Sequence, residues 1–247
     1  MPARRVLVLG GTGEARLLAP VLLAEGYDTV TSLAGVTSAP LLPPGKTRIG
    51  GFGGTGGIAD YLSTERCAAL VDASHPYAAR IAAHGFAAAR SLGIPYLRLE
   101  RPPWIAGDGD RWIMVDDAAA AAAALPDGGR ALLAIGRQHL APFFAKSGIS
   151  GVVRAIEAPD ITIPPRWRLL RERPPFTAEK EGALIDGEGL DHVVSKNSGG
   201  SATYGKIVAA RERKIPVMMI RRPLKPDAPT FASPADLAQA IGRAIRA

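Results

Sequence analysis

The sequence contains a single cysteine, Cys67, so it cannot form an internal disulfide. Long apolar stretches are also missing, because proline, glycine or a charged residue interrupts every hydrophobic run before it reaches the ~20 residues needed to cross a bilayer. The first five residues lead directly into an apolar strand, without the apolar core or the cleavage site of an export signal. These absences predict a cytoplasmic protein that does not enter the membrane.

Several catalytic motifs are absent as well. None of the five tyrosines is followed four residues later by lysine, which argues against the short-chain dehydrogenase mechanism. The four histidines and Cys67 show no metal-ligand spacing, and neither a Gly-x-Ser-x-Gly elbow nor a phosphate-binding P-loop occurs. Carbonyl reduction by the short-chain mechanism, metal-dependent hydrolysis and nucleotide hydrolysis are therefore disfavoured, and we expect no bound metal.

The composition indicates a globular protein with a basic surface. Hydrophobic residues make up 47% of the chain, which suffices for a core, and the net charge of +7 attracts anions. Zinc-finger spacing, an aromatic RNA-binding strand and a helix with a dense run of lysine or arginine are all absent, so we expect no nucleic-acid partner. A small polyanionic ligand and a merely solvating basic surface both remain compatible with the charge.

Apolar strands and amphipathic helices alternate along the chain, which is typical of α/β proteins with parallel sheets. The run from Arg4 to Gly10 is typical of a strand buried on both faces, and a helix from Glu14 to Glu25 follows it, with Gly26 at the C-cap. Further strands are expected at 27–33, 47–50, 67–72, 94–99, 112–115, 131–136, 150–156, 192–195 and 217–221, and further helices at 58–65, 77–92, 118–124, 204–214 and 234–246.

The composition changes after Trp104, where a glycine- and aspartate-rich loop at 107–110 precedes a new strand. We place a domain boundary at this loop, with a nucleotide-binding domain at 1–108 and a second α/β domain at 109–247. The predicted fold class is therefore α/β, with two Rossmann-like domains, mostly parallel sheets and a ligand cleft between the domains.

The turn after the first strand suits a dinucleotide pyrophosphate. Glycines let the backbone approach the phosphates, and the N–H groups at the start of the following helix favour negative charge. Counted from Gly11, the third glycine of the G-x-G-x-x-G fingerprint is replaced by Arg16, so the helix is not expected to pack on the strand in the usual way. A tight turn without a ligand is the alternative. The candidate residues are Gly10, Gly11, Thr12, Gly13 and Glu14.

The end of the second strand bears on the choice of cofactor. NAD sites place an acidic residue there to bind the ribose 2′-hydroxyl, whereas this segment offers hydroxyls and no acid. A 2′-phosphate fits such a segment, so NADPH is favoured over NADH. The candidate residues are Ser32, Ala34, Gly35, Thr37 and Ser38.

A polar loop follows the strand at 67–72, at the carboxyl end where ligands bind in open α/β sheets. Ser74, His75 and Tyr77 in this loop could face the cofactor. The same residues also suit a capped helix start, with Ser74 as N-cap and Pro76 at the first helical position, and both roles are compatible. A structural role for a neutral His75 remains open as well.

Two polar segments in the second half could bind the carboxylates or phosphates of a ligand. Two glycines, hydroxyls, an amide and lysines near the strand at 192–195 form a suitable nest for anions, and an earlier strand end could add a cation. Either segment could instead be only a polar loop. The candidate residues are Lys196, Asn197, Ser198, Gly199, Gly200 and Lys206, together with Arg137 and Gln138.

Three motifs taken together give the chain a resemblance that extends over its whole length. The motifs are Gly-Gly-Thr-Gly-Glu-Ala at 10–15, Asp-Ala-Ser-His-Pro-Tyr-Ala at 72–78 and Ser-Lys-Asn-Ser-Gly-Gly at 195–200. With them the chain resembles the precorrin-6A reductase family of cobalamin biosynthesis. The second and third motifs are the specific ones, whereas the glycine turn is common to many families.

The resemblance implies two Rossmann-like domains and a hydride transfer from NADPH to one double bond of the precorrin-6A ring, giving the dihydro product precorrin-6B. It also implies a tetrapyrrole as the small-molecule partner, whose carboxylates suit a basic protein, and hand-over contacts with other enzymes of the pathway. His75, Tyr77 and Lys196 are candidate proton donors, although solvent or the acidity of the macrocycle could serve. Ser74 and His75 are also counted among the cofactor-binding residues.

Two other functions are compatible with the sequence. A non-catalytic NADP-binding sensor would use the same glycine turn but would not need the second anion-binding loop. An NADPH oxidoreductase for a different anionic substrate would need both. Whether the substrate contains cobalt, and whether the protein is a monomer, do not follow from the sequence.

Overall fold

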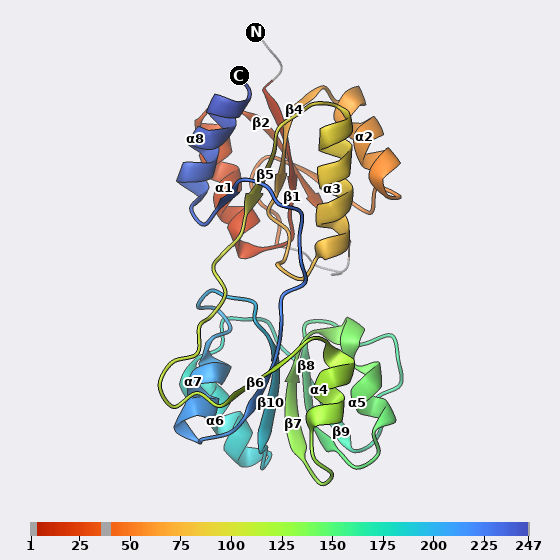
Figure 1. Ribbon diagram of the computed structural model, residues 1–247, viewed down its shortest axis with the longest axis vertical. Helices are drawn as coiled ribbons and strands as arrows, with labels where there is room; N and C mark the ends of the chain where they lie inside the picture. The colour runs from red at the N-terminus through yellow and green to blue at the C-terminus, as the bar shows by residue number, and fades with distance from the viewer. Residues whose placement is uncertain (1–3, 36–40, 247) are drawn as a thin grey trace. The chain divides into compact units, whose positions relative to one another are not determined.

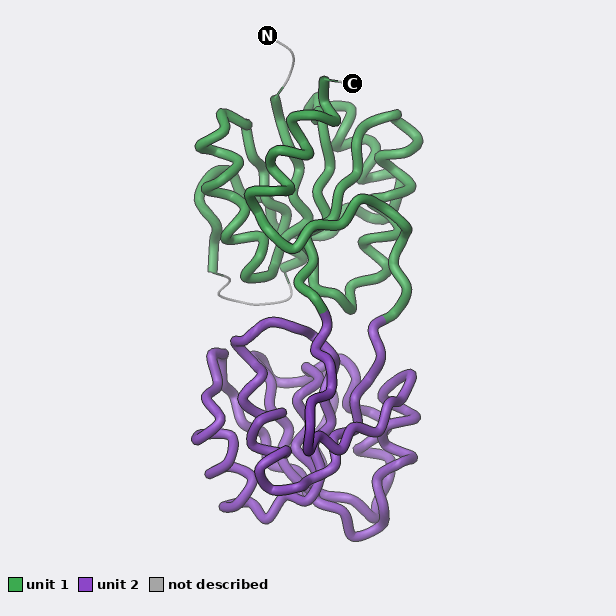
Figure 2. The backbone as a smooth tube through the Cα atoms, turned by 60° about the vertical axis from the view of Figure 1, so that its left-hand side comes forward, with its two compact units in different colours: residues 1–102, 223–247 green, residues 103–222 purple. Residues whose placement is uncertain are grey.

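The computed structural model describes residues 4–35 and 41–246, which fold into two compact units (Figure 2). Unit 1 comprises residues 1–102 and 223–247, and unit 2 comprises residues 103–222, so the chain passes from one unit to the other twice. Within the described residues, each unit contains one six-stranded, fully parallel sheet with helices on both of its faces (Figure 1). This confirms the predicted α/β class with two Rossmann-like halves.

The sheet of unit 1 has the strand order β12-β5-β4-β1-β2-β3. The order in which strands are added to the sheet switches from one side of β1 to the other between β3 and β4, so that β4 lies beside β1. Open α/β sheets bind ligands at the carboxyl ends of the strands beside such a switch. The strands are β1 (Arg5–Leu9), β2 (Asp28–Leu33), β3 (Lys46–Ile49), β4 (Cys67–Asp72), β5 (Tyr96–Leu99) and β12 (Thr230–Phe231).

The alternation of side chains along β1 explains how helices cover both faces of this sheet. Val6 and Val8 pack with α1 (Gly13–Ala24) and α8 (Pro234–Ala244) on one face. Leu7 and Leu9 pack with α2 (Thr55–Thr64) and α3 (Ala79–Ser91) on the other. The continuous apolar run of β1 is therefore buried on both sides, as the sequence predicts.

Unit 2 repeats this plan, with the strand order β6-β11-β10-β7-β8-β9 and a corresponding switch that places β10 beside β7. One face is covered by α6 (Ala178–Gly187) and α7 (Gly205–Glu212), and the other by α4 (Ala118–Ala124) and α5 (Ala141–Ala145) (Figure 1). The strands are β6 (Trp112–Val115), β7 (Arg130–Ala134), β8 (Ser150–Ala155), β9 (Trp167–Arg171), β10 (His192–Lys196) and β11 (Val217–Ile220).

The C-terminal segment belongs to unit 1, which differs from the predicted division into 1–108 and 109–247. β12 pairs with β5 and so covers an edge strand, and Leu237 and Ile241 of α8 pack with Leu18 and Leu22 of α1. The apolar stripe of α8 predicts a buried helix, but it does not show which sheet the helix covers. The prediction therefore assigned α8 to the second domain, which precedes it in the sequence.

Four of these helices and strands were absent from the predicted list, namely β9, α5, α6 and β12, of which α5 and β12 have only five and two residues. β9 begins with the buried Trp167, but its apolar residues alternate poorly with Arg168 and Arg171, and α6 has only a weak apolar stripe although Thr177 caps its first turn. Among residues 4–35 and 41–246, no helix is both long enough and apolar enough to cross a membrane.

Candidate active site

The glycine turn after β1 joins β1, β2 and α1 closely. The backbone N–H of Gly10 donates to the Ser32 carbonyl at 2.8 Å, and a Cβ at Gly10 would lie 2.5 Å from Cγ2 of Thr31. Ala15 is 1% exposed and belongs to the same buried cluster as Val6 and Val8 of β1, whereas Arg16 is half-buried. The helix therefore packs closely on the sheet at Ala15, and the expectation of unusual packing at Arg16 is wrong. Counted from Gly10, Ala15 stands at the third position of the fingerprint, and Thr12 replaces the glycine at the second.

Gly11 and Thr12 shape the start of α1. Gly11 has a φ of +98°, and a Cβ there would meet no atom within 4 Å among the described residues, so its backbone faces open space. Thr12 is the N-cap: its Oγ1 accepts from the Ala15 N–H at 3.1 Å and donates to the Ala73 carbonyl at 2.7 Å. The glycine turn is thereby fastened to the loop that follows β4, and the helix N-terminus faces the carboxyl end of the sheet.

Gly13 and Glu14 form the first turn of α1. A carboxylate oxygen of Glu14 lies 2.5 Å from Nη1 of Arg101, which follows β5. The positive charge of Arg101, in the segment after β5, thus balances the negative charge of Glu14 beside a predicted phosphate site.

The end of β2 carries Ser32, which is 6% exposed, followed by the exposed Ala34 and Gly35. Nη1 of Arg48 on β3 donates to Ser32 Oγ at 3.2 Å and to the Gly50 carbonyl at 2.6 Å, and Nη2 donates to the Gly51 carbonyl at 2.7 Å. The guanidinium also lies 3.7 Å from the ring centre of Phe52. A cation is thus fixed beside Ser32. The predicted residues Thr37 and Ser38 lie outside the described part of the chain.

The loop after β4 is organised by Asp72, whose Oδ1 accepts from the Ser74 N–H at 3.0 Å and from the Ser74 hydroxyl at 2.5 Å. α3 begins only at Ala79, so the prediction of Ser74 as N-cap and Pro76 at the first helical position is wrong. The N-cap position of α3 is Ala78, four residues after Ser74, and Ser74 instead belongs to a tight turn in which both its N–H and its hydroxyl donate to Asp72.

His75 and Tyr77 lie together in this loop and are both half-buried. Nδ1 of His75 accepts from the Tyr77 N–H at 3.3 Å, and the two ring centres are 5.7 Å apart. Both predicted residues therefore lie at the carboxyl end of β4, next to the glycine turn, to which Thr12 connects them through Ala73.

In unit 2 the loop after β10 is held by Asn197, which is 8% exposed. Its side-chain amide forms a two-point clamp on the Trp104 backbone, accepting from N–H at 2.7 Å and donating to C=O at 2.9 Å. The Trp104 indole N–H donates to the Gly200 carbonyl at 2.8 Å. Asn197 thus shapes the loop that was predicted to bind anions.

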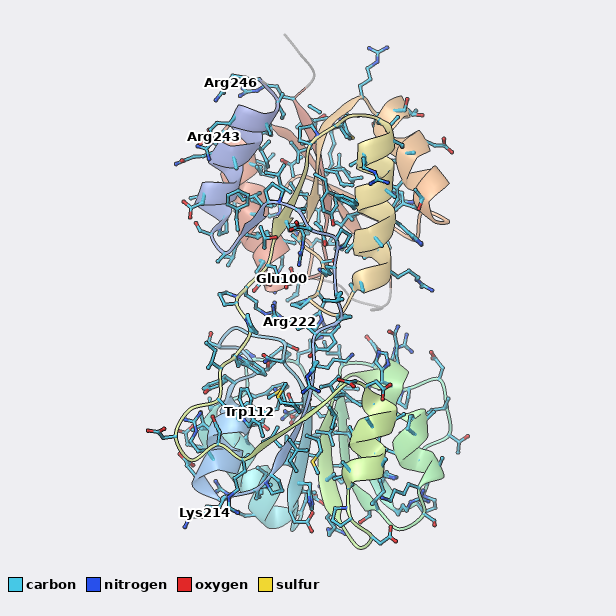
Figure 3. All side chains as sticks on the ribbon, viewed as in Figure 1. Glu100, Trp112, Lys214, Arg222, Arg243 and Arg246 are labelled. Atoms are coloured by element: carbon cyan, nitrogen blue, oxygen red, sulfur yellow. The ribbon has the colours of Figure 1, made fainter. Side chains whose placement is uncertain are left out.

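Arg222 fixes the same loop from the end of unit 2, and Figure 3 labels its side chain. Its Nε donates to the Asn197 carbonyl at 2.8 Å and its Nη2 donates to the Ser198 carbonyl at 3.1 Å. Gly199 and Gly200 have φ values of +72° and +73°, which glycine adopts without strain. The Lys-Asn-Ser-Gly-Gly motif is therefore a loop that Arg222 and Trp104 hold through several hydrogen bonds.

Lys196 and the Arg137–His139 turn lie at neighbouring strand ends, because β10 pairs with β7 in register. Burial lowers the pKa of Lys196 to about 8, and it also lowers the pKa of His139, with a smaller contribution from the charge of Lys196. Arg137 donates to the Ala158 carbonyl and to Asp160, and Gln138 is exposed. The predicted anion-binding residues at 137–138 and 196–200 thus share the carboxyl edge of this sheet.

A family model described as Precorrin-6x reductase CbiJ/CobK matches residues 5–242. The chain belongs to this family. A precorrin-6A reductase from Rhodobacter capsulatus is 45% identical over 224 residues, which cover 90% of this chain and 89% of that protein. A cobalt-precorrin-6A reductase from Priestia megaterium is 31% identical, covering 88% of this chain and 90% of that protein.

A solved structure of "CobK precorrin-6A reductase" has the same fold, with a TM-score of 0.91 at 42% identity, covering 97% of this chain and 96% of that one. As a member of the precorrin-6x reductase family, the chain is an oxidoreductase, and its hydride donor is a nicotinamide cofactor. The sensor considered from the sequence is therefore not retained. In the described part of the chain, no group of three or more His, Cys, Asp or Glu side chains could hold a metal ion.

Lys206 is placed differently from its predicted role in substrate binding. It lies in α7 with 3% exposure, donates to the Thr203 carbonyl at 2.6 Å and lies 4.7 Å from the Trp104 ring centre. Burial lowers its pKa to about 7, the charge of Arg154 lowers it further and that of Glu181 opposes the change. Lys206 therefore contacts Trp104, which in turn is bonded to Asn197 in the loop after β10, and so supports that loop indirectly.

The pKa of Lys206 predicts how stability depends on pH. Between pH 7 and pH 9 the unfolded chain keeps a proton on this lysine that the folded chain gives up, so the free energy of unfolding rises with pH. Urea unfolding is expected to show a rise about 1–3 kcal/mol larger in the wild type than in Lys206→Met over this range. Lys180→Met, at an exposed lysine of α6, is the control, and parallel curves for wild type and Lys206→Met would contradict the assignment.

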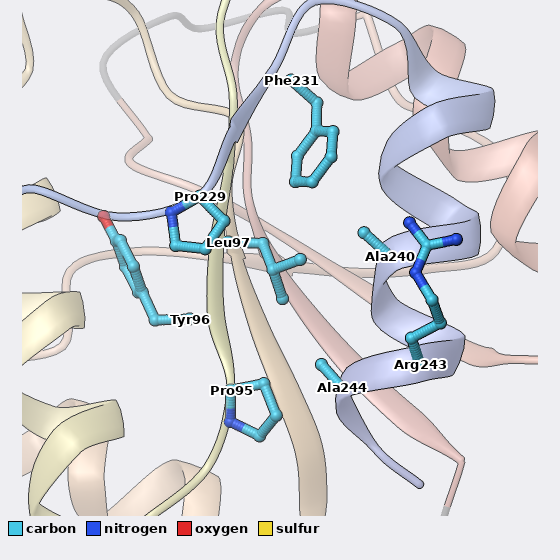
Figure 4. Close-up of a pocket in the computed structure, with 8 residues that line it drawn as sticks. All are labelled: Pro95, Tyr96, Leu97, Pro229, Phe231, Ala240, Arg243 and Ala244. Carbon is cyan, nitrogen blue, oxygen red and sulfur yellow. The ribbon is translucent and has the colours of Figure 1, made fainter. Parts of the chain in front are cut away.

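A separate hollow of about 510 Å³ in unit 1 does not belong to the candidate site (Figure 4). It lies between the start of β5 and the last turns of α8 and is mostly apolar. Ligands bind parallel sheets at the carboxyl ends of their strands, whereas Pro95 in this hollow precedes its strand. The lining residues are Pro95, Tyr96, Leu97, Pro229, Phe231, Ala240, Arg243 and Ala244.

Sequence patterns missed four residues that shape these sites, namely Arg48, Arg101, Trp104 and Arg222. Each stands at or just beyond a strand end or beside a proline, and a search for cations in such positions would have found three of them. The clamp between Asn197 and Trp104 joins segments 93 residues apart, so no local signal marks it.

Proposed function

We propose that this protein uses NADPH to reduce one double bond of precorrin-6A to the dihydro product, precorrin-6B, in cobalamin biosynthesis. Membership of the precorrin-6x reductase family supports the reaction. The observation that carries the choice of NADPH is the cation at Arg48, fixed beside Ser32 at the end of β2. In unit 1 we assign the nucleotide to the carboxyl ends of β1, β2 and β4.

The preference for NADPH follows from the charge at the end of β2. An acidic residue there would repel a 2′-phosphate, and residues 32–45 contain no Asp or Glu. A guanidinium has five N–H donors, more than the three contacts of Arg48 use, and it matches the geometry of a phosphate. Phe52 and the Gly50 and Gly51 carbonyls hold Arg48 in place, so little of its side-chain entropy remains to be lost on binding.

The residues of unit 1 act mainly by holding the nucleotide. The N–H groups at Gly11 to Gly13 and the N-terminus of α1 suit the pyrophosphate. Ser74, His75 and Tyr77 stand beside this turn, where they would orient the nicotinamide end. The bound cofactor supplies the hydride, and fixing it against the substrate turns a bimolecular transfer into a local one.

For the substrate we propose the polar loops of unit 2. Precorrins carry many carboxylates, and Lys196, Arg137, Gln138 and the backbone at 198–200 present cations and hydrogen-bond donors at one sheet edge. The net charge of +7 adds attraction at long range. Asn197 contributes by holding the loop in shape.

We further propose the metal-free macrocycle as the physiological substrate. The chain is 45% identical to a relative named for precorrin-6A and 31% identical to one named for cobalt-precorrin-6A. Comparing the two compounds as substrates under the same conditions tests this choice, and a higher kcat/KM for the cobalt compound would overturn it. The cytoplasmic location and the contacts with other cobalamin enzymes stay predictions.

The proton donor is proposed to be His75, Tyr77 or Lys196, and Lys196 is proposed to act chiefly by orienting substrate. Because the pKa of Lys196 is about 8, its charge is present at pH 7 and mostly lost at pH 9. The KM for precorrin-6A is therefore expected to rise about 10-fold over this range in the wild type and to stay nearly constant in Lys196→Arg, whose guanidinium remains charged. Steady-state kinetics at both pH values measure this.

Lys196→Ala separates binding from chemistry. A binding role predicts a raised KM at pH 7 with turnover largely kept. Lost turnover at an unchanged substrate affinity would show instead that Lys196 takes part in the proton transfer.

The reaction itself is tested by following NADPH oxidation optically with and without precorrin-6A. We expect oxidation only when both the protein and precorrin-6A are present. If no precorrin preparation caused NADPH consumption, the proposed function would be wrong.

A further inference from the structure

Four charged side chains form a cluster in unit 1, at the carboxyl ends of β4 and β5, in which Asp72 and Lys225 are buried and Arg98 and Glu100 are partly buried. The ammonium of Lys225 lies 3.2 Å from Asp72 Oδ2 and 3.3 Å from Glu100 Oε2, and its side chain is 3% exposed. Arg98 pairs with Glu100 at 2.6 Å. Two carboxylates thus face two cations, and Figure 3 labels Glu100 among them.

The cluster ties a distant part of the chain to the candidate nucleotide site. Lys225 belongs to the segment that returns to unit 1 after residue 222, and it is 153 residues from Asp72 in the sequence. Arg98 also donates to the Pro226 carbonyl at 3.3 Å. The returning segment is therefore held at two consecutive residues.

Asp72 connects Lys225 to the loop that follows β4. One of its oxygens faces the Lys225 ammonium, and the other accepts both hydrogen bonds from Ser74. The Lys225 ammonium itself lies 3.5 Å from Ser74 Oγ. Thr12, the cap of α1, donates to the carbonyl of Ala73, which lies between Asp72 and Ser74 in the sequence. The glycine turn, the Ser74 loop and the returning segment thus meet through these contacts.

The charges of this cluster depend on one another. Burial opposes the ionisation of Glu100, but the hydrogen bond from Arg98 and the charge of Lys225 outweigh it and lower the pKa of Glu100. Removing one member of a buried pair leaves an uncompensated charge, which costs far more than the pair contributes. The Tyr96 hydroxyl also donates to Asp72 Oδ2 at 3.2 Å, but it carries no charge. Without Lys225 the buried Asp72 carboxylate would lose its nearest cation, and a shift of this carboxylate would alter its hydrogen bonds to Ser74.

We propose that Lys225 is a positioning residue of the nucleotide site, which acts through Asp72 to hold the Ser74–His75 loop against the glycine turn. This inference rests on the proposal that unit 1 binds NADPH. It assigns to the returning segment, which contains none of the recognised motifs, a part in building that site.

The test is a double-mutant cycle on NADPH affinity, measured by fluorescence titration without any precorrin. Lys225→Met is expected to raise the Kd about 10-fold, because a buried carboxylate left without its cation disturbs the loop. Because Lys225 acts through the loop that Ser74 begins, adding Ser74→Ala is expected to cause little further loss. Combining Lys225→Met with Arg48→Gln should multiply the two effects, since β1 and β2 separate β4 from β3 in the sheet.

Lys180→Met is the matched control and should bind NADPH as the wild type does. If Lys225→Met does not fold, Asp72→Asn removes the charge on which both Lys225 and Ser74 depend, and a Kd raised at least 5-fold is expected. An unchanged Kd in the folded variant, or losses that multiply with Ser74→Ala, would overturn the inference alone. If the wild type did not bind NADPH, the proposed cofactor would fail and the inference with it.

Discussion

Replacing Gly11 by alanine is expected to weaken NADPH binding about 10- to 100-fold, the equivalent of one or two lost hydrogen bonds to a charged group. Gly11 has a φ of +98°, where an L-residue is strained, and its missing side chain leaves open space. In our proposal the pyrophosphate approaches the backbone in that space, so a methyl group both strains the turn and holds the phosphate away. Fluorescence titration with NADPH measures the loss.

Gly128→Ala provides the matched control for Gly11→Ala. Gly128 has a φ of +83°, is equally open, and lies before β7 at the opposite end of its sheet from the candidate loops. Both variants are expected to lose about 1–3 kcal/mol of stability through backbone strain. Only Gly11→Ala should lose NADPH affinity, and equal affinity in the two variants would place the pyrophosphate elsewhere.

Arg48→Gln is expected to raise the KM for NADPH about 10- to 100-fold and to leave the KM for NADH within about 3-fold of the wild type. The proposed target of the guanidinium is the 2′-phosphate, which NADH lacks. Glutamine retains a hydrogen-bond donor for the Gly50 and Gly51 carbonyls but cannot supply the positive charge. Steady-state kinetics with the two cofactors at a fixed precorrin-6A concentration measure the change.

Arg90→Gln is the control for Arg48→Gln because it removes the same charge from an exposed position in the last turn of α3. It should change neither KM. If Arg48→Gln raised both KM values equally, the guanidinium would serve the shape of the loop rather than the 2′-phosphate, and the proposed basis for NADPH preference would be wrong.

Local patterns predicted the repeating architecture well because burial leaves a strong trace in the sequence. The run Val6 to Leu9 is apolar without interruption, and both faces of β1 are covered by helices. The glycine at position 10 was also predictable, since a small residue is required where the chain after β1 passes close to Thr31. Such features depend on neighbours in the chain or on the nearest strand.

Long-range pairing left no such trace. The segment 223–247 carries a recognisable helix, but only the three-dimensional structure shows that β12 pairs with β5 rather than with a strand of unit 2. Lys225 has no motif around it, and its partners Asp72 and Glu100 are more than a hundred residues away. Contacts of this kind depend on topology.

For the candidate site residues, the position in the fold was predictable from the sequence, but the hydrogen-bond partners were not. Thr12, Ser74 and Lys196 lie at strand ends as predicted, because the position of a loop follows from the position of its strand. Their hydrogen bonds were less predictable: Ser74 donates to Asp72 and lies four residues before the N-cap of α3, and the Lys206 ammonium lies over the Trp104 ring. A sequence position identifies a sheet edge, whereas the partner of a side chain depends on packing.

The most direct test of the proposed reaction follows the transferred hydrogen. The protein is incubated with precorrin-6A and NADPH deuterated at both C4 positions, and the product is analysed by mass spectrometry. The proposed reaction predicts a product that has gained one deuterium from the cofactor, transferred as deuteride, and one proton from the solvent. A reduced product without deuterium, or no reduced product in the presence of bound NADPH, would contradict it.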